Sequence, residues 1–433
     1  VIFKKRRKRV KYQDQQWDFL GENTKEYTHG FHTYPAMMIP QIARKLIEDY
    51  TTKDSKILFD PYMGSGTSLI EASIKGLEAI GTDLNPLARL ISKAKTTKYL
   101  INKLENEIYK FEKNFIESND YLNYNIDIPN FAIIDTWFKE KNKIELGYIK
   151  GFINKINDEK TKLFFLVAFT ETVRKVSLTR NGEFKLYRIA ENKREEFNPE
   201  TFKLMLDKLK ENLVGAREYS QAKLNKKEIK IFDFNTSYGI PENILQEESV
   251  DIVVTSPPYG DSGTTVAYGQ FSRLANEWLE EKEAVKVDSK LMGGKKSSEF
   301  HLFGFKPLDD ILMEYKKIDE EKNKKRTLEV INFYDDYLSS INNVAKVIKK
   351  GGVVAYVVGN RRVYDIELPT DEITRNFFER NGFSHIQTII RNIPNKRMPS
   401  KTNPSNIAGG TQVSTMTKEY IVILKKEKLI KLF

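Results

Sequence analysis

The chain has 433 residues, of which 40% are hydrophobic and 12% aromatic, so it is long enough to fold around a substantial core. Its formal net charge of +11 favours a polyanionic partner such as nucleic acid, although a lysine-rich solvated surface would give the same total. It contains no cysteine, which excludes disulfides, thiolate metal sites and cysteine nucleophiles.

The first segment, residues 1–30, is predicted to be a basic N-terminal arm. Its opening stretch VIFKKRRKRVKY has no apolar segment after the basic residues, so it lacks the pattern of a secretory signal. It either lies along phosphates or is a disordered tail. The longest strongly apolar run, residues 163–169, is far shorter than the roughly 20 residues that a membrane helix needs. We therefore expect no membrane partner and a cytoplasmic location.

Segments with an α/β pattern alternate with segments of helical pattern along the rest of the chain. Residues 31–100 and 226–433 contain short β-rich apolar runs separated by helical patterns, which predicts two halves of an α/β domain. Residues 101–225 are rich in lysine and glutamate with apolar positions at helical spacing, so we predict a mainly helical insertion and a candidate for target recognition. A smaller helical insertion is expected at about residues 278–326. The last two predicted strands, GFSHIQTIIRN and KEYIVILKK, are joined by a long loop.

The stretch ILFDPYMGSGTSLIEASIKG predicts a strand over residues 57–59, a glycine-rich turn and a helix from Thr67. Gly64 and Gly66 would let a ligand approach the backbone, and the helix N-terminus offers unpaired N–H groups. No Lys-Ser/Thr pair follows the glycines, so a loop for a nucleoside triphosphate is not expected. Asp60 would repel a pyrophosphate but attract an ammonium group. An ordinary strand-to-helix loop is the alternative.

A second strand is predicted to end in IGTDLNP, where the carboxylate of Asp83 can accept hydrogen bonds from both hydroxyls of a ribose. Asn85 and Pro86 are expected to cap and begin the next helix. A ligand with a nucleoside at one end and an amino acid at the other suits Asp60 together with Asp83, and S-adenosylmethionine is such a ligand. The alternative for Asp83 is a helix-capping role.

A third stretch, VVTSPPYG, places two prolines directly after the strand that Val253 and Val254 would end, and these prolines continue neither a helix nor an interior strand. FDPYMGSGT followed by TSPPYG resembles motifs I and IV of the S-adenosylmethionine-dependent amino-methyltransferases of DNA. HTYPAMMIPQIARKLI is similar to motif X of that family. The resemblance covers residues 31–95 and 231–433. A structural Pro-Pro turn is the alternative for TSPPYG.

The resemblance implies an α/β fold, with a Rossmann-like methyltransferase sheet whose last strand is reversed. Residues 31–100 would form its cofactor-binding half and residues 226–433 its catalytic half. S-adenosyl-L-methionine would be the cofactor and double-stranded DNA the substrate, with a separately encoded restriction endonuclease as a further partner. The four histidines are scattered without ligand spacing, so no metal is expected.

The cofactor-binding residues that the resemblance implies come from motif X, motif I, the second strand and the third strand. Asp233, with Phe234 beside it, would serve the adenine, and a solvated loop charge is the alternative for Asp233. The full set is Tyr34, Pro35, Asp60, Tyr62, Gly64, Ser65, Gly66, Thr67, Asp83, Leu84, Asp233 and Phe234.

The catalytic residues that the resemblance implies are Ser256, Pro257, Pro258 and Tyr259. An exocyclic amino nitrogen is a poor nucleophile, and Ser256 Oγ and the Pro257 carbonyl would accept its hydrogen bonds and align it with the methyl group. The prolines fix the turn, and Tyr259 offers a flat face on which an extruded base stacks.

The target base is narrowed by composition and by the motif. C5 methylation of cytosine needs a cysteine nucleophile, which this chain lacks. In the family, S-P-P-Y is associated more with N4 of cytosine, and D-P-P-Y or N-P-P-Y more with N6 of adenine, so we place cytosine ahead of adenine. A guanine-N2 methyltransferase of RNA and a non-catalytic DNA-binding subunit are the rival interpretations.

Besides the basic arm, the polar segment DSGTTVAYGQFSR after the proline turn is expected to close over a flipped base, and two further stretches are candidates for DNA contacts. RKVSLTRNGEFKLYR interleaves basic and aromatic residues around an Asn-Gly turn, as in a hairpin that enters a groove. RNIPNKRMPSKTNPSN lies between the last two predicted strands, on the expected side of the active site. Solvated surfaces are the alternative for both. The residues expected to meet DNA are Arg174, Arg180, Lys185, Arg188, Lys396 and Arg397.

Overall fold

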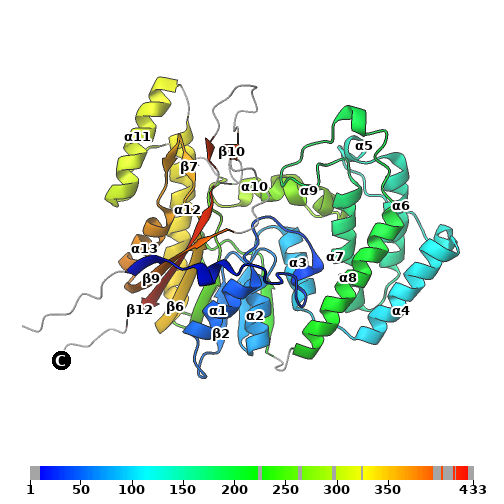
Figure 1. Cartoon of the computed structure of the whole chain (residues 1–433), viewed down its shortest axis with the longest axis horizontal. Coiled ribbons are helices and arrows are strands. Elements are labelled where there is room, and N and C mark those ends of the chain that lie inside the picture. Colours follow the sequence, from blue (N-terminus) through cyan, green and yellow to red (C-terminus); the bar gives the residue numbers. More distant parts are fainter. Residues whose placement is uncertain are drawn as a thin grey trace, which may run out of the picture.

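The computed structural model describes residues 10–222, 227–261, 266–294, 299–322, 325–393, 401–402, 413–414 and 416–427. Figure 1 shows a central sheet with helices on both of its faces and a helical body at one side. The predicted α/β Rossmann-like fold with a mainly helical insertion is therefore confirmed.

The central sheet has eight strands in the order β1-β9-β12-β6-β5-β2-β3-β4. Neighbouring strands are parallel, except that β12 is antiparallel to both β6 and β9, so the reversed last strand is also confirmed. The strands are β1 (Val10–Gln13), β2 (Ile57–Asp60), β3 (Glu78–Thr82), β4 (Ile229–Phe232), β5 (Val250–Thr255), β6 (Ile348–Val358), β9 (Phe383–Asn392) and β12 (Lys418–Lys426). Two short pairs lie outside this sheet, β7 (Arg362–Val363) with β8 (Ile366–Glu367) and β10 (Lys401–Thr402) with β11 (Val413–Ser414).

Two helical layers sandwich the sheet, and β5 shows why its central residues, 252–254, are all apolar. Ile252 and Val254 pack with Leu46 and Leu69 in one layer, whereas Val253 packs with residues of the opposite layer. Successive side chains of a strand point to opposite faces, so a central strand needs apolar residues at every position. The first layer contains α1 (Pro40–Tyr50), α2 (Thr67–Lys75) and α3 (Pro86–Thr96), and the second contains α11 (Lys306–Lys322), α12 (Arg326–Val347) and α13 (Thr370–Arg380).

The helical insertion follows α3 and has its own aromatic core. The rings of Phe111, Phe115 and Phe152 contact one another there. One helix from the later half of the chain joins this body, because Trp278 of α9 is fully buried against Phe169. The helices of the insertion are α4 (Ile101–Glu112), α5 (Ile134–Trp137), α6 (Glu140–Asn154), α7 (Glu159–Val176) and α8 (Thr201–Ala222), and the later helices beside it are α9 (Tyr268–Trp278) and α10 (Val287–Lys290).

The basic arm predicted for residues 1–30 packs onto the domain in its described part, which begins at residue 10. Residues 10–13 form β1, which pairs with β9 at the edge of the sheet. Trp17 is only 3% exposed, and both carboxylate oxygens of Asp18 accept hydrogen bonds from Asn392. An unpaired strand edge and a large apolar ring together draw this segment onto the domain. The basic residues 1–9 lie outside the described part of the chain.

Candidate active site

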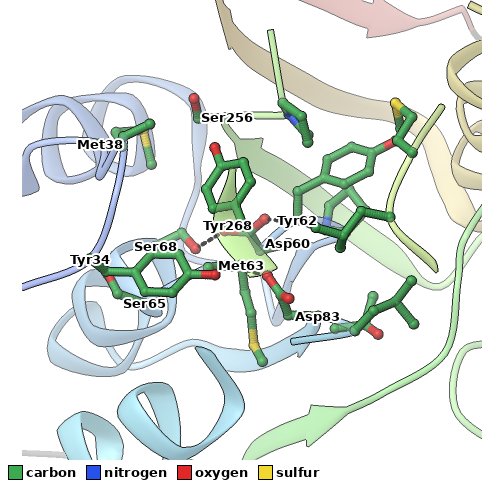
Figure 2. Close-up of a pocket in the computed structure, with 18 of the residues that line it drawn as sticks. Tyr34, Met38, Asp60, Tyr62, Met63, Ser65, Ser68, Asp83, Ser256 and Tyr268 are labelled. Atoms are coloured by element: carbon green, nitrogen blue, oxygen red, sulfur yellow. Dashed lines mark hydrogen bonds between the residues drawn. The ribbon is translucent and has the colours of Figure 1, made fainter. Parts of the chain in front are cut away.

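A cavity lies at the carboxyl ends of β2, β3 and β5, where ligands bind in open parallel sheets. It contains about 890 Å³ of empty space, counted with its open mouth. Figure 2 shows side chains from several separate segments pointing into it. The residues expected from the sequence that line it are Tyr34, Pro35, Asp60, Tyr62, Gly64, Ser65, Thr67, Asp83, Leu84, Phe234, Ser256 and Pro258.

Asp60 ends β2 and is only 3% exposed. One carboxylate oxygen accepts hydrogen bonds from Thr255 Oγ1 at 2.5 Å and from the backbone N–H of Tyr62 at 3.0 Å, and the other accepts from the Ser68 hydroxyl. Burial raises the pKa of Asp60 to about 6, while these donors act in the opposite direction. The carboxylate is thus ionised at neutral pH and suits an ammonium group.

Asp83 directly follows β3 and is half-buried. Its two carboxylate oxygens accept backbone N–H groups, one from Gly64 at 3.1 Å and one from Asn85 at 2.8 Å. Burial raises the pKa of Asp83 to about 6, and the two amides oppose this rise. Asn85 caps α3 by accepting from the Leu87 amide, so the helix does not need Asp83 as its cap. The Asp83 carboxylate can therefore serve hydroxyl groups of a ligand.

The two glycines of the turn between β2 and α2 have different tasks. Gly64 lines the cavity and has φ of +48°, where side chains other than glycine are strained. Gly66 does not line the cavity, contrary to the expectation of ligand approach. A Cβ at Gly66 would lie 2.8 Å from Ser92 Oγ, and its φ is +78°, so packing against α3 and backbone conformation require this glycine.

Tyr34, which was expected at the cofactor, forms one side of the cavity together with Tyr268, which the sequence did not single out. Tyr34 stacks on Tyr268 with ring centroids 5.9 Å apart, and its hydroxyl accepts a hydrogen bond from Asn85 Nδ2 at 3.1 Å. Tyr268 begins α9 and comes from a stretch that we expected to close over a base, although no single residue there stood out. Further lining residues without a sequence signal are Met37, Met38, Met63, Ser68, Thr82, Asn235, Thr236, Leu291 and Met292.

The third strand supplies Phe234 to the cavity but not Asp233. Asp233 is exposed and does not line the cavity, whereas Phe234, Asn235 and Thr236 do. The Thr82 hydroxyl donates to the Phe234 carbonyl at 2.7 Å, which fixes the chain just beyond Asp233. Asp233 therefore lies outside the described lining of the cavity, and its contact with the adenine stays a prediction.

The TSPPYG turn follows β5 and places Ser256 at the cavity. The Ser256 hydroxyl donates to the carbonyl of Val357 on β6 at 3.1 Å, which leaves its lone pairs as acceptors. Pro258 also lines the cavity, but Pro257 is buried and does not. The turn therefore presents a neutral acceptor next to the two carboxylates.

Tyr259 does not line the cavity and is tied to the antiparallel strand of the sheet. Its hydroxyl donates to Glu419 on β12 at 2.9 Å, and burial raises its pKa well above the usual range. A Cβ at Gly359 would lie 2.7 Å from the Tyr259 ring, so the glycine makes room for this ring. Arg391 forms an ion pair with Glu419 and completes this support.

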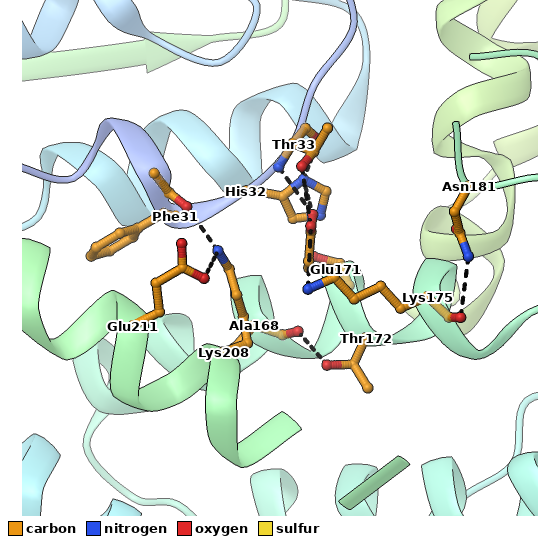
Figure 3. A network of polar contacts seen from close by, with 12 residues as sticks. Phe31, His32, Thr33, Ala168, Glu171, Thr172, Lys175, Asn181, Lys208 and Glu211 are labelled. Atoms are coloured by element: carbon orange, nitrogen blue, oxygen red, sulfur yellow. Dashed lines mark hydrogen bonds and ion pairs between the residues drawn. The ribbon is translucent and has the colours of Figure 1, made fainter. Parts of the chain in front are cut away.

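The helical insertion holds the segment that leads to Tyr34 (Figure 3). Glu171 on α7 accepts a hydrogen bond from the Thr33 N–H at 3.0 Å and another from the Thr33 hydroxyl at 3.1 Å. His32 Nδ1 lies 3.2 Å from the same carboxylate. Lys208 on α8 donates to a main-chain carbonyl of this segment at 2.8 Å. One wall of the cavity thus depends on contacts with the insertion.

The candidate DNA-binding residues differ in their exposure to solvent. Arg174 is buried, donates to the carbonyls of Phe271 and Glu183, and lies over the Phe271 ring, so it is not placed to meet phosphates. This corrects the expectation for Arg174, whose side chain packs between α7 and α9.

Of the other DNA-binding candidates, Arg180 has a side chain that is 54% exposed, at a turn closed by a bridge between Thr179 and Arg188. Lys185 and Arg188 on the same turn are partly exposed. Lys396 and Arg397 lie outside the described residues.

The described residues contain no cluster of three or more histidine, aspartate or glutamate side chains that could hold a metal ion. None of the helices in the same part of the chain is long and apolar enough to cross a membrane.

Comparison with known proteins adds the following. A family model described as DNA methylase matches residues 2–93. The type II methyltransferase M.MvaI of Kocuria varians is 42% identical, and the alignment covers 96% of this chain and 95% of that protein. The type II methyltransferase M.BsoBI of Geobacillus stearothermophilus is 23% identical over 84% of this chain and 80% of its own length. Among solved structures, the rRNA methyltransferase AviRa from Streptomyces viridochromogenes is 9% identical, with 91% of this chain and 88% of that chain covered and a TM-score of 0.31.

Proposed function

This chain belongs to the S-adenosylmethionine-dependent DNA amino-methyltransferases of the restriction-modification type, and on that premise we propose that it methylates N4 of cytosine at a specific site in double-stranded DNA. The family membership makes S-adenosyl-L-methionine the cofactor and DNA the substrate. The choice of cytosine N4 goes further and rests on the residues of the catalytic turn.

The observation that carries the proposal is the position of the Ser256 hydroxyl at the cavity. It donates to the Val357 carbonyl, so toward the cavity it acts only as a neutral acceptor. A neutral acceptor aligns an exocyclic amino group by accepting its N–H without adding a third negative charge to a cavity that already holds Asp60 and Asp83. The association of S-P-P-Y with cytosine then favours N4 over the amino group of adenine.

The residues of the cavity fit the two ends of S-adenosylmethionine. We propose that Asp60 binds the ammonium group, that Asp83 accepts hydrogen bonds from the ribose hydroxyls, and that Phe234 packs against the adenine. When bound, the cofactor supplies an electrophilic methyl group on a sulfonium. Among the described residues that line the cavity none is a lysine, arginine or histidine, so the charges present complement a cationic ligand.

The chain contributes alignment and exclusion of water rather than a covalent intermediate. Ser256 and the carbonyl of Pro257 would accept hydrogen bonds from the amino group and direct its lone pair at the methyl carbon. As the new N–C bond forms and the old S–C bond breaks, the nitrogen becomes cationic and then loses a proton to water. Tyr259, whose hydroxyl is fixed by Glu419, is proposed to stack against the extruded base.

Two further roles remain proposals that follow from the family. The helical insertion over residues 101–225 would contribute to target recognition, since it is a separate body beside the cavity. A separately encoded restriction endonuclease would cleave the same site when it is unmethylated. DNA modified by this enzyme should then resist that endonuclease.

The decisive experiment identifies the methylated base. The full chain is incubated with labelled S-adenosylmethionine and unmethylated duplex DNA, and the digested nucleosides are separated by mass spectrometry. We expect N4-methyldeoxycytidine as the labelled product. N6-methyldeoxyadenosine would keep the alignment mechanism and refute cytosine as the target, whereas label in RNA alone would refute DNA as the substrate.

A matched variant tests the catalytic turn. Ser256→Ala should lower kcat by about 10² because one aligned acceptor is lost, while affinity for S-adenosylhomocysteine stays nearly unchanged. If kcat and the affinity for S-adenosylhomocysteine fall by the same factor, Ser256 would be assigned to cofactor binding instead.

A further inference from the structure

One buried lysine next to the active site has no hydrogen-bond partner among the described residues. Lys95, in the last turn of α3, is 0% exposed, and no described residue accepts a hydrogen bond from its Nζ. Burial, assisted by the charge of Lys208, lowers the pKa of Lys95 to about 7. Lys93 on the same helix is exposed, so burial is specific to the face that carries Lys95. A buried ammonium without a partner is costly, so Lys95 requires an explanation such as a ligand, an ion or a water molecule that meets its Nζ.

Lys95 lines a second, smaller cavity that adjoins the cofactor cavity. Met37, Met38 and Thr67 line both cavities, so these three residues form the wall between them. Two of them are methionines, whose flexible side chains can move aside. Thr67 is the first residue of the nine-residue helix α2, whose first turn offers backbone N–H groups to an anion.

The other titratable group of the second cavity does not supply a charge. His29 Nε2 lies 2.9 Å from Glu71 Oε1, which places the ring proton on Nε2 and leaves Nδ1 as an acceptor. Burial lowers the pKa of His29, so the ring is neutral. Among the described lining residues, Lys95 is therefore the group that attracts an anion.

The cofactor itself contains an anion for which the described lining of the first cavity offers no cationic side chain. Its carboxylate is attached to the same carbon as the ammonium group assigned to Asp60. The described lining of the first cavity includes the carboxylates of Asp60 and Asp83 but no cationic side chain. Like charges repel, so the cofactor carboxylate must turn away from Asp60 toward a cation. Thr67 lines the first cavity and leads to the cavity of Lys95.

We propose that Lys95 binds the carboxylate of S-adenosylmethionine, which reaches past Thr67 and the first turn of α2 into the second cavity. The proposal deepens the proposed function, on whose cofactor it rests. It explains why a lysine is kept without a partner behind the active site. In the complex, the carboxylate supplies the charge-assisted hydrogen bond that Lys95 otherwise lacks.

The test compares two ligands that differ only in the carboxylate. Calorimetry measures the affinity of the full chain for S-adenosylhomocysteine and for its decarboxylated counterpart, S-adenosyl-3-thiopropylamine. The wild-type chain should prefer the former. Lys95→Met keeps the length and apolar stem of the side chain, and it should reduce this preference by about tenfold or more. Lys93→Met, two positions away on the exposed face, should leave the preference unchanged.

Three results would overturn the proposal. In the first, Lys95→Met retains the full wild-type preference. In the second, it weakens the binding of both ligands equally, which would mean that Lys95 only supports the fold. A third result would be thermal stabilisation of the wild type, but not of Lys95→Met, by added chloride together with an unchanged ligand preference. That combination would assign the cavity to a free anion. Thermal melting of each variant verifies that it is folded.

The failure of this proposal is distinguishable from failure of the proposed function. The wild-type chain is first tested for binding of S-adenosylhomocysteine and for methylation of DNA. If the wild-type chain fails to bind S-adenosylhomocysteine or fails to methylate DNA, the proposed function is rejected. Normal wild-type activity with an unchanged preference in Lys95→Met would reject only the role of Lys95.

Discussion

At the scale of single residues, the active site combines a buried carboxylate, Asp60, with a half-buried one, Asp83. Asp60 is surrounded by donors from Thr255, Ser68 and the Tyr62 amide, and Asp83 by two backbone amides. Burial nevertheless raises the pKa of each carboxyl to about 6. Both carboxylates suit a ligand that carries a cation and hydroxyl groups. Because each pKa is about 6, mild acid protonates them and removes their charge.

This sensitivity predicts how ligand affinity depends on pH. S-adenosylhomocysteine should bind more weakly as the pH falls through about 6, because protonated Asp60 no longer attracts its ammonium group and protonated Asp83 accepts fewer hydrogen bonds. Calorimetric titrations from neutral to mildly acidic pH measure this effect. In Asp83→Asn, affinity should be lower at neutral pH and should depend less steeply on pH, since one of the two protonations is removed.

Stability without ligand should change in the opposite direction. Each folded-state pKa of about 6 lies above the unfolded value of 3.8, so Asp60 and Asp83 stabilise the fold most below pH 3.8, and this contribution is lost as the pH rises through about 6. Mild acid should therefore weaken binding without unfolding through these two groups. A parallel loss of affinity and melting temperature would contradict this assignment.

At the scale of elements, the insertion and the sheet domain are joined at the segment that leads into the cavity. Glu171 of α7 accepts two hydrogen bonds from Thr33, and Tyr34 follows directly. The stacking of Tyr34 on Tyr268 adds α9 to the same wall. Movement of the insertion would therefore be transmitted to the cofactor cavity through short, partly buried hydrogen bonds.

Breaking this junction should affect cofactor binding from outside the cavity. Glu171→Ala removes both acceptors for Thr33, and we expect affinity for S-adenosylhomocysteine to fall by at least about fivefold. Glu171→Gln keeps an acceptor and should restore part of the affinity. Glu105→Ala, which removes an exposed ion pair with Arg217 in the same insertion, should have no such effect. Equal behaviour of the Glu171→Ala and Glu105→Ala variants would show that the junction does not influence the cavity.

At the scale of the whole molecule, the net charge of +11 is not concentrated in the cavity. The cofactor site is acidic, and cations lie on the surface, as at the turn that carries Arg180, Lys185 and Arg188. This arrangement suits a protein that binds a cationic cofactor inside and a polyanion outside.

Binding to duplex DNA should consequently weaken with salt. The logarithm of affinity should fall linearly with the logarithm of salt concentration, and Arg180→Ala should reduce the slope by about 1 if Arg180 meets a phosphate. Fluorescence anisotropy with labelled DNA measures this slope. Lys53→Ala is the control. Lys53 is exposed in the loop before β2, so it lies near the amino end of this strand, whereas the cavity lies at the carboxyl end. Identical slopes for both variants would remove the turn from the DNA interface.

The sequence by itself determined the features that depend on neighbours along the chain. The glycine-rich turn after β2, the Asn85 and Pro86 start of α3, and the proline turn with Ser256 follow from local backbone preferences and from motif order. The reversed last strand followed from the family resemblance.

Only the tertiary structure decided whether each of these side chains is buried, faces solvent or lines a cavity. It buried Arg174, turned Asp233 to solvent, and brought Tyr268 and Lys95 to the walls of the two cavities. It also made residues 10–13 an edge strand instead of part of a free arm. Burial and partners depend on contacts between segments far apart in the chain, and hydrophobic periodicity within one segment does not specify those contacts.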